Sequence, residues 1–109
     1  MATFLRTLIK SNIGIEPATV LYTGSNNTMT VIGFNIANIT SMIVTIDIKI
    51  NDNIPSTGYY LKGIEIPPNS NLKVITNGEK LVLGNNCSIE VNSNMQNAVD
   101  IVISYAELL

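Results

Sequence analysis

The sequence predicts an all-β protein: a single antiparallel β-sandwich, of jelly-roll or Ig-like type, with about eight strands in residues 1–109. Three observations lead to this prediction. β-branched residues recur in short runs in which apolar and polar positions alternate. Clusters of Asn, Gly, Pro and Ser separate these runs at spacings of about 8–12 residues, as turns do. No long segment keeps the roughly 3.6-residue apolar period of a helix.

The most apolar stretch, residues 31–50, decides between a membrane-spanning helix and two strands. A spanning helix needs about 20 residues with few polar interruptions. Here Asp47 and Lys49 would each cost about 2.5–3.5 kcal/mol near the bilayer centre. Both charged residues instead alternate with isoleucines, which is the period of a half-buried strand. Residues 31–37 and 44–50 are therefore predicted to be the two strands of a β-hairpin.

The remaining runs follow the same pattern within one domain, residues 1–109, in which residues 1–17 form an N-terminal arm or interface strand. Asn77-Gly78 is a favoured hairpin turn. Gly63 marks a bulge, because the alternation slips there. The other expected strands are residues 3–10, 18–23, 59–66, 72–76, 80–83, 87–91 and 98–107.

The composition excludes several classes of function. Charged residues make up 13% of the chain, about half the usual share, and the Lys and Arg residues do not cluster, so no direct nucleic-acid contact is expected. The absence of histidine removes histidine-based triads and imidazole metal sites. Cys87 is the only cysteine and is interpreted as a small buried hydrophobe. Nothing brings two carboxylates together for hydrolysis, so we expect no enzyme, no catalytic residue, no metal and no cofactor.

Apolar residues also occupy strand positions that should face water. Outward positions of a sandwich are normally polar, so two interpretations are open. One is slippage of the alternation together with ordinary apolar surface. The other is that an outer face or edge packs against other copies, which fits the low charge content. The outward positions are Val31, Ala37, Ile75, Val82, Val102 and Ala106, and the predicted interface residues are Phe4, Leu5, Leu8, Val31, Val82 and Val102.

A second functional hypothesis rests on Tyr59 and Tyr60. Exposed aromatic rings can present an apolar surface to a ligand, and the neighbouring Asn-rich loops offer hydrogen-bonding groups. The alternative function is therefore a carbohydrate-binding β-sandwich module, such as a fibre-tip receptor-binding domain, with ligand contacts at these two tyrosines.

Several segments carry a family resemblance. They include a Tyr-Thr strand end at residues 22–23, an Ala-Asn strand end at 37–38, a Pro-Pro turn at 67–68 and a final Ser-x-x-Glu-Leu strand at 104–108. In this order the chain resembles, over nearly its whole length, small β-sandwich virion proteins of tailed bacteriophages. The matching segments are LIKSNIG (8–14), TVLYT (19–23), TVIGFNIAN (30–38), IEIPPN (64–69), KLVL (80–83) and ISYAEL (103–108).

The resemblance implies a non-enzymatic virion structural protein of capsid-decoration, neck or tail-accessory type. Such a protein would form a homo-oligomer and dock on other virion proteins, such as major capsid or neck and tail proteins, without contacting a membrane. The first residues lack the apolar segment of a signal peptide. We therefore expect synthesis in the host cytoplasm and a final location in the virion.

Overall fold

The computed structural model describes residues 3–52, 56–75 and 79–108. In these ranges the chain forms nine β-strands, and no helix there is long and apolar enough to cross a membrane. The prediction of an all-β fold is therefore confirmed. The strands are β1 (Thr3–Ile13), β2 (Ala18–Tyr22), β3 (Thr28–Asn38), β4 (Val44–Asn51), β5 (Thr57–Ile66), β6 (Asn71–Lys73), β7 (Leu81–Leu83), β8 (Ser88–Ser93) and β9 (Val99–Leu108).

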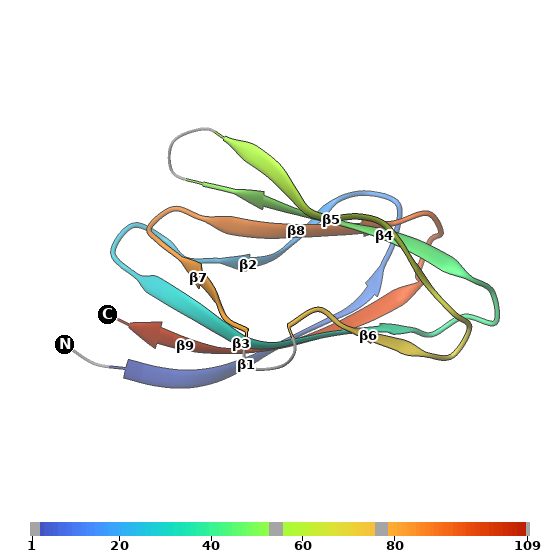
Figure 1. The fold of residues 1–109 in the computed structure, drawn as a ribbon, viewed down its shortest axis with the longest axis horizontal. Helices are drawn as coiled ribbons and strands as arrows, with labels where there is room; N and C mark the ends of the chain where they lie inside the picture. The colour runs from blue at the N-terminus through green and yellow to red at the C-terminus, as the bar shows by residue number, and fades with distance from the viewer. Residues whose placement is uncertain (1–2, 53–55, 76–78, 109) are drawn as a thin grey trace.

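The strands form two antiparallel sheets that lie one above the other (Figure 1). The five-stranded sheet has the order β1-β9-β3-β6, with β7 also paired to β3, and the four-stranded sheet has the order β2-β8-β4-β5. The pairing is nested: β1 pairs with β9, β2 with β8, β3 with β6 and β7, and β4 with β5. A long hairpin rolled into two sheets gives this order, so of the two predicted sandwich types the observed one is the jelly roll.

β6 and β7 lie end to end along the same edge of β3. Leu72 of β6 is opposite Ile36, and Leu81 of β7 is opposite Val31. Together they serve as one interrupted edge strand. The turn predicted at Asn77-Gly78 lies outside the described residues.

β3 and β4 are strands, as predicted, but they lie in different sheets, so the predicted hairpin is wrong. The reason is the side chain of Asn38, which is buried where β3 ends. Its Nδ2 donates to the carbonyl oxygens of Met42 (2.7 Å), Ile66 (3.0 Å) and Pro67 (3.1 Å). Its Oδ1 accepts from the backbone N–H of Thr40 at 2.9 Å. These bonds hold the chain in a crossover between the sheets, where a tight turn would have kept it in one sheet.

The core fills the space between the two sheets with aliphatic side chains. Alternate residues of β4, β8 and β9 point inward, as the period of two predicts. Cys87 is buried, as predicted. Ile75 was predicted to face water but packs in the core, because the chain leaves the β3 ladder after Lys73. Fully buried members include Ile36, Ile46, Ile48, Ile66, Ile89, Ile101 and Ile103.

Val31 is fully buried, so the prediction that it faces water is wrong. Val31 lies opposite Tyr105 and Gly33 lies opposite Ser104, which makes Ile32 an extra residue in β3. A bulge of this kind shifts the alternation by one residue. Val31 therefore points into the core, while Ile32 is 47% exposed. The slip predicted at Gly63 is confirmed, because the β4–β5 register shifts there and Gly63 has φ of +66°.

Candidate functional site

The outer face of the five-stranded sheet is made of aliphatic and hydroxyl side chains. The inward residues of β9 are buried, so the residues between them, and their partners opposite on β1, point outward. We call this surface the neutral face. It consists of Thr3, Leu5, Thr7, Ile9, Val102, Ser104, Ala106 and Leu108, with the exposed residues Ile32 of β3 and Val82 of β7.

Two outward charged residues of this sheet border the neutral face. Asp100 is opposite Ala37, beyond Val102 on β9, and its Oδ1 accepts from the backbone N–H of Asn12 at 2.9 Å. Lys73 is opposite Asn35, which is itself opposite Val102. Lys73 therefore limits the neutral face on the β6 side, and Asp100 limits it at the end of the sheet away from the Thr3–Leu108 pair.

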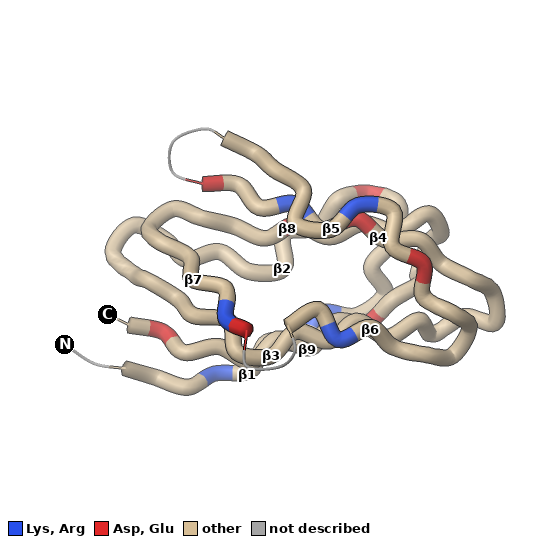
Figure 2. The backbone as a smooth tube through the Cα atoms, in the orientation of Figure 1, with Lys and Arg blue, Asp and Glu red and all other residues tan. Residues whose placement is uncertain are grey.

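The outer face of the four-stranded sheet is different. Its outward positions carry acids and bases, and Figure 2 shows blue and red segments along β4 and β5. Lys49 lies opposite both Glu90 and Tyr59, and Thr45 lies opposite Glu65. We call this surface the charged face, and its charged residues are Asp47, Lys49, Lys62, Glu65 and Glu90.

The four edges of the two sheets also differ. β2 is five residues long with a register shift, β5 has two register shifts, and β6 and β7 are interrupted. Short, bulged or broken edges resist pairing with another chain. β1 has none of these features between Thr3 and Lys10, where its register with β9 is unbroken. It is therefore the long, straight edge at which another strand can add.

β1 is fixed to the sandwich by an ion pair at its centre. Arg6 Nε donates to Glu107 Oε1 at 2.8 Å, and Asn27 Nδ2 donates to Glu107 Oε2 at 3.1 Å. The guanidinium of Arg6 also lies 5.2 Å from the ring centre of Phe4. The charge of Arg6 is thus neutralised within its own chain, and β1 is held in place as part of the sheet.

The structure places the predicted interface residues in three environments. Leu5, Val82 and Val102 lie on the neutral face and are 78%, 64% and 40% exposed. Phe4 and Leu8 lie opposite Glu107 and Ile103, so they point to the inner side of the sheet. Val31 is buried in the core and offers no surface.

Sequence reasoning did not name two exposed residues of the neutral face individually. Ile9 lies within the predicted interface strand and shares its side of β1 with Leu5, so the period of two was a sufficient signal to name it. Ile32 was hidden by the bulge, because a simple alternation places it with Phe34 in the core.

A further exposed cluster was missed in the crossover between β3 and β4. Ile39, Met42 and Ile43 are all exposed there. The loop is rigid, because Asn38 bonds across it and the Ile39 N–H donates to the Ala98 carbonyl at 3.0 Å.

Tyr59 and Tyr60 do not form a joint platform. Tyr59 is opposite Lys49 and is exposed, whereas Tyr60 packs against the core. The ammonium of Lys62 lies 4.1 Å from the Tyr59 ring centre and that of Lys49 lies 5.2 Å from it. Tyr59 is 49% exposed beside these two ammonium groups, so the two tyrosines do not present the single shared surface on which the carbohydrate hypothesis was based.

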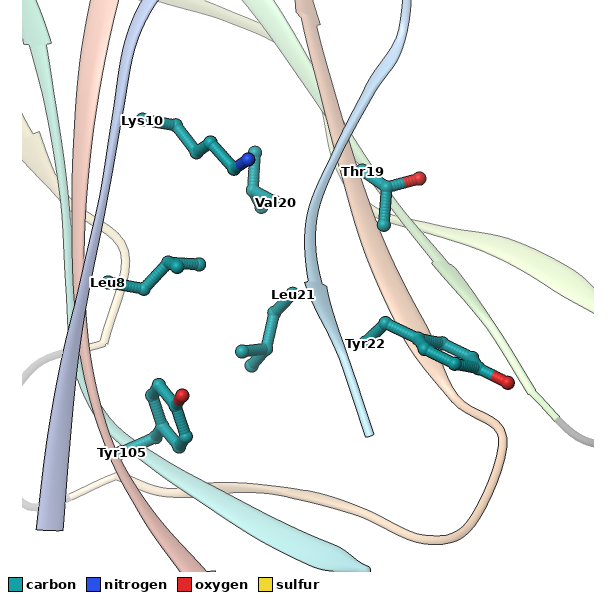
Figure 3. A pocket seen from close by; sticks show the side chains of 7 residues that line it. All are labelled: Leu8, Lys10, Thr19, Val20, Leu21, Tyr22 and Tyr105. Carbon is teal, nitrogen blue, oxygen red and sulfur yellow. The ribbon is translucent and has the colours of Figure 1, made fainter. Parts of the chain in front are cut away.

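A groove of about 270 Å³ lies between the edge strands β1 and β2 (Figure 3). The described residues that line it include no carboxylate and no thiol, so they supply neither a pair of acids nor a nucleophilic cysteine. Its lining combines aliphatic side chains with one ammonium, one hydroxyl and two phenols, and consists of Leu8, Lys10, Thr19, Val20, Leu21, Tyr22 and Tyr105.

Comparison with known proteins finds similarity in fold alone. No known family matches this sequence, and no curated protein matches it. A solved structure of Bacillus endospore appendages, described as a family of disulfide-linked pili, is similar with a TM-score of 0.56 and 6% identity, covering 96% of this chain and 86% of that one. A capsid protein chain of the infectious bursal disease virus particle aligns with a TM-score of 0.41 and 12% identity; 96% of this chain is covered, but only 30% of that chain. This chain therefore shares its all-β sandwich architecture with a pilus protein.

Proposed function

We propose that this protein is a non-enzymatic structural subunit that associates with copies of itself through the neutral face and the β1 edge. The observation that carries the proposal is the contrast between the two outer faces. One presents aliphatic and hydroxyl groups and the other presents charges. Interface cores are depleted of charged residues and enriched in apolar ones, so the neutral face is the one suited to burial.

The chemistry of the described residues supports the non-enzymatic part of the proposal. The chain has no histidine, and the described residues contain no group of three or more Cys, Asp or Glu that could hold a metal ion. The similar fold of a pilus protein supports a structural role, because that protein assembles into an appendage. Within this proposal, the finer role is that of a virion component, such as a capsid-decoration, neck or tail-accessory protein that docks on other virion proteins.

The oligomeric state of the purified chain tests the proposal. Sedimentation velocity and light scattering from about 1 to 100 µM should give a mass of two copies or more. Val82→Lys and Val102→Lys each place a charge on the neutral face outside β1 and should shift the mass toward the monomer. A standard interface buries about 1,600 Å² in total, and a lysine buried in it without a partner weakens it strongly.

The matched control is Met42→Lys. Met42 is a large apolar residue, 60% exposed, in the crossover between β3 and β4 and not on the neutral face or β1. Its substitution should leave the mass distribution unchanged. A wild-type monomer at 100 µM, or equal effects of Val82→Lys and Met42→Lys, would refute the proposal.

A further inference from the structure

The outward residues of β1 form a symmetric pattern, because the order of their side-chain classes is the same in both directions along the strand. Thr3, Leu5, Thr7 and Ile9 give hydroxyl, aliphatic, hydroxyl and aliphatic along the unbroken part of β1, and Ser11, just beyond it, continues the sequence pattern with a hydroxyl. Thr7 is the centre of this pattern. An antiparallel strand placed beside β1 meets the pattern reversed, so a second β1 presents matching groups at every outward position.

We infer that β1 pairs with β1 of a second copy, antiparallel, about a two-fold axis at Thr7. This inference rests on the proposed function and names the partner and register of the β1 edge. The axis sets Thr7 opposite Thr7, Leu5 opposite Ile9 twice, and Thr3 opposite Ser11. Cross-strand pairs of threonines and of aliphatic side chains each stabilise a sheet.

The inward residues are compatible with the same register. Arg6 comes opposite Leu8, and Phe4 comes opposite Lys10 of the second copy. No two like charges are directly opposed, and Arg6 already has Glu107 at 2.8 Å in its own chain. Lys10 meets an aromatic ring, which is a favourable neighbour for an ammonium.

Neighbouring axes are worse for identifiable reasons. A two-fold axis at Arg6 would place Arg6 of one copy opposite Arg6 of the other. A two-fold axis at Leu8 would place Arg6 of each copy opposite Lys10 of the other. Like charges directly opposite each other destabilise a strand pair. An axis at Leu5 sets Ile9 opposite a position before Thr3, outside the described strand, and so gives up a pair of described aliphatic residues. An axis at Ile9 reaches Asn12, whose φ of +57° ends the straight part of the edge.

An axis between two residues fails in another way. It sets inward residues opposite outward ones, which places the second sandwich on the other side of the sheet. The axis at Thr7 keeps both sandwiches on one side. The two five-stranded sheets then become one sheet, and the two neutral faces join into one continuous surface.

A charge swap at Thr7 tests this inference. Thr7 is exposed, so Thr7→Asp and Thr7→Lys should both fold. At a two-fold axis each variant meets its own charge, and each should associate about fivefold more weakly than the wild type. An equimolar mixture brings Asp opposite Lys and should recover at least wild-type association, measured by sedimentation of the two variants alone and mixed.

Thr57→Asp and Thr57→Lys are the matched controls, because Thr57 is an exposed threonine on the edge strand β5, at the edge of its sheet away from β2, and lies opposite the neutral residue Asn51. They should associate like the wild type, alone or mixed. A mixture of the Thr7 variants that stays as weak as its components would overturn the inference. If Val82→Lys weakens association and the Thr7 variants do not, the proposed function stands and this register fails; a wild-type monomer refutes both.

Cross-linking tests independently whether Thr7 of one copy lies opposite Thr7 of the other. Residues directly opposed in an antiparallel pair have Cα atoms about 4.5–5.5 Å apart, which suits a disulfide. Oxidised Thr7→Cys should run as a covalent dimer, while Thr57→Cys and the wild type, whose Cys87 is buried, should not. A Thr7→Cys protein that remains monomeric under oxidation would contradict the axis at Thr7.

Discussion

The two sheets share one core but present opposite outer surfaces. Both follow the same alternation of inward and outward residues, and both contribute fully buried isoleucine and valine to the interior. Outside, Leu5, Ile9 and Val102 stand on one sheet where Asp47, Lys49 and Glu90 stand on the other. The low charge content of this chain is therefore not spread evenly: the charged face carries acids and bases, and the neutral face has none.

This difference indicates that the alternation of apolar inward residues with outward residues is specified separately from the chemistry of the outward residues. The alternation is sufficient to build the sandwich, because outward positions accept polar, charged and, as on the neutral face, aliphatic residues. The choice among outward residues then decides what each face can contact. The following predictions test whether the two sheets are alike inside and differ only outside.

The largest effect is expected where the sheets are joined. Asn38→Ala removes the amide that satisfies the carbonyls of Met42, Ile66 and Pro67 at the crossover. Unfolding in urea should show a loss of about 3 kcal/mol, because buried carbonyl groups lose their partners. Asn71→Ala removes an exposed amide that bonds to Asn35, its one side-chain partner among the described residues, and it should change stability by less than about 0.5 kcal/mol. Equal losses would contradict the role given to Asn38.

The two inner faces should respond alike. Val31 in β3 and Val91 in β8 are both fully buried, one in each sheet. Val31→Ala and Val91→Ala should each lower the free energy of unfolding by about 2 kcal/mol, from lost burial and the cavity left behind. Val82→Ala, at an exposed position, should cost less than about 0.5 kcal/mol when measured in dilute solution. If Val31→Ala lowered the free energy of unfolding only slightly, Val31 would not be in the core, and the β3 bulge would lie at another position.

The edge of the four-stranded sheet should depend on one backbone conformation. Gly63 has φ of +66°, and a side chain there would cost about 1 kcal/mol. Gly58→Ala is the control, because an added Cβ meets nothing within 4 Å at either glycine and Gly58 has no positive φ. Gly63→Ala should be destabilised in thermal unfolding and Gly58→Ala should not. If both variants lost equal thermal stability, the bulge at Gly63 would not be the feature that distinguishes β5 from β1.

The smallest effect is expected on the charged face. Lys62→Met removes the ammonium 4.1 Å from the Tyr59 ring centre and should cost about 0.5 kcal/mol. Lys73→Met, on the other sheet, is the control, because within the described part of the chain no ring lies near its ammonium. A loss at Lys73 as large as at Lys62 would mean that the lysine–tyrosine contact adds nothing.

Much of the fold could be predicted because its signal is local. Runs such as Val44–Asn51 and Val99–Leu108 alternate clearly enough to define a strand and its buried side. Pairing could not be predicted in the same way, since β3 and β4 adjoin in sequence yet lie in different sheets. The deciding contact was the Asn38 side chain with Ile66, a residue 28 positions away. No local pattern encodes such a contact.

The candidate surface was predicted in part. Leu5, Val82 and Val102 were placed outward from alternation alone, and they are exposed. Val31 was misplaced because the extra residue Ile32 reverses the alternation without any Pro or charge to mark the change. Gly33 beside it was the available signal, because a glycine inside a strand often accompanies a bulge.

The pairing of the first strand with the last has a consequence for how quickly this chain can fold. Arg6 and Glu107 bond across 101 positions of sequence, so the five-stranded sheet cannot close until almost every described residue has been synthesised. Proteins dominated by such distant pairings fold in about milliseconds to seconds, far more slowly than helical bundles. Until β9 arrives, β1 and β3 both expose unpaired backbone, and a nascent chain of this protein is then most vulnerable to joining its neighbours prematurely.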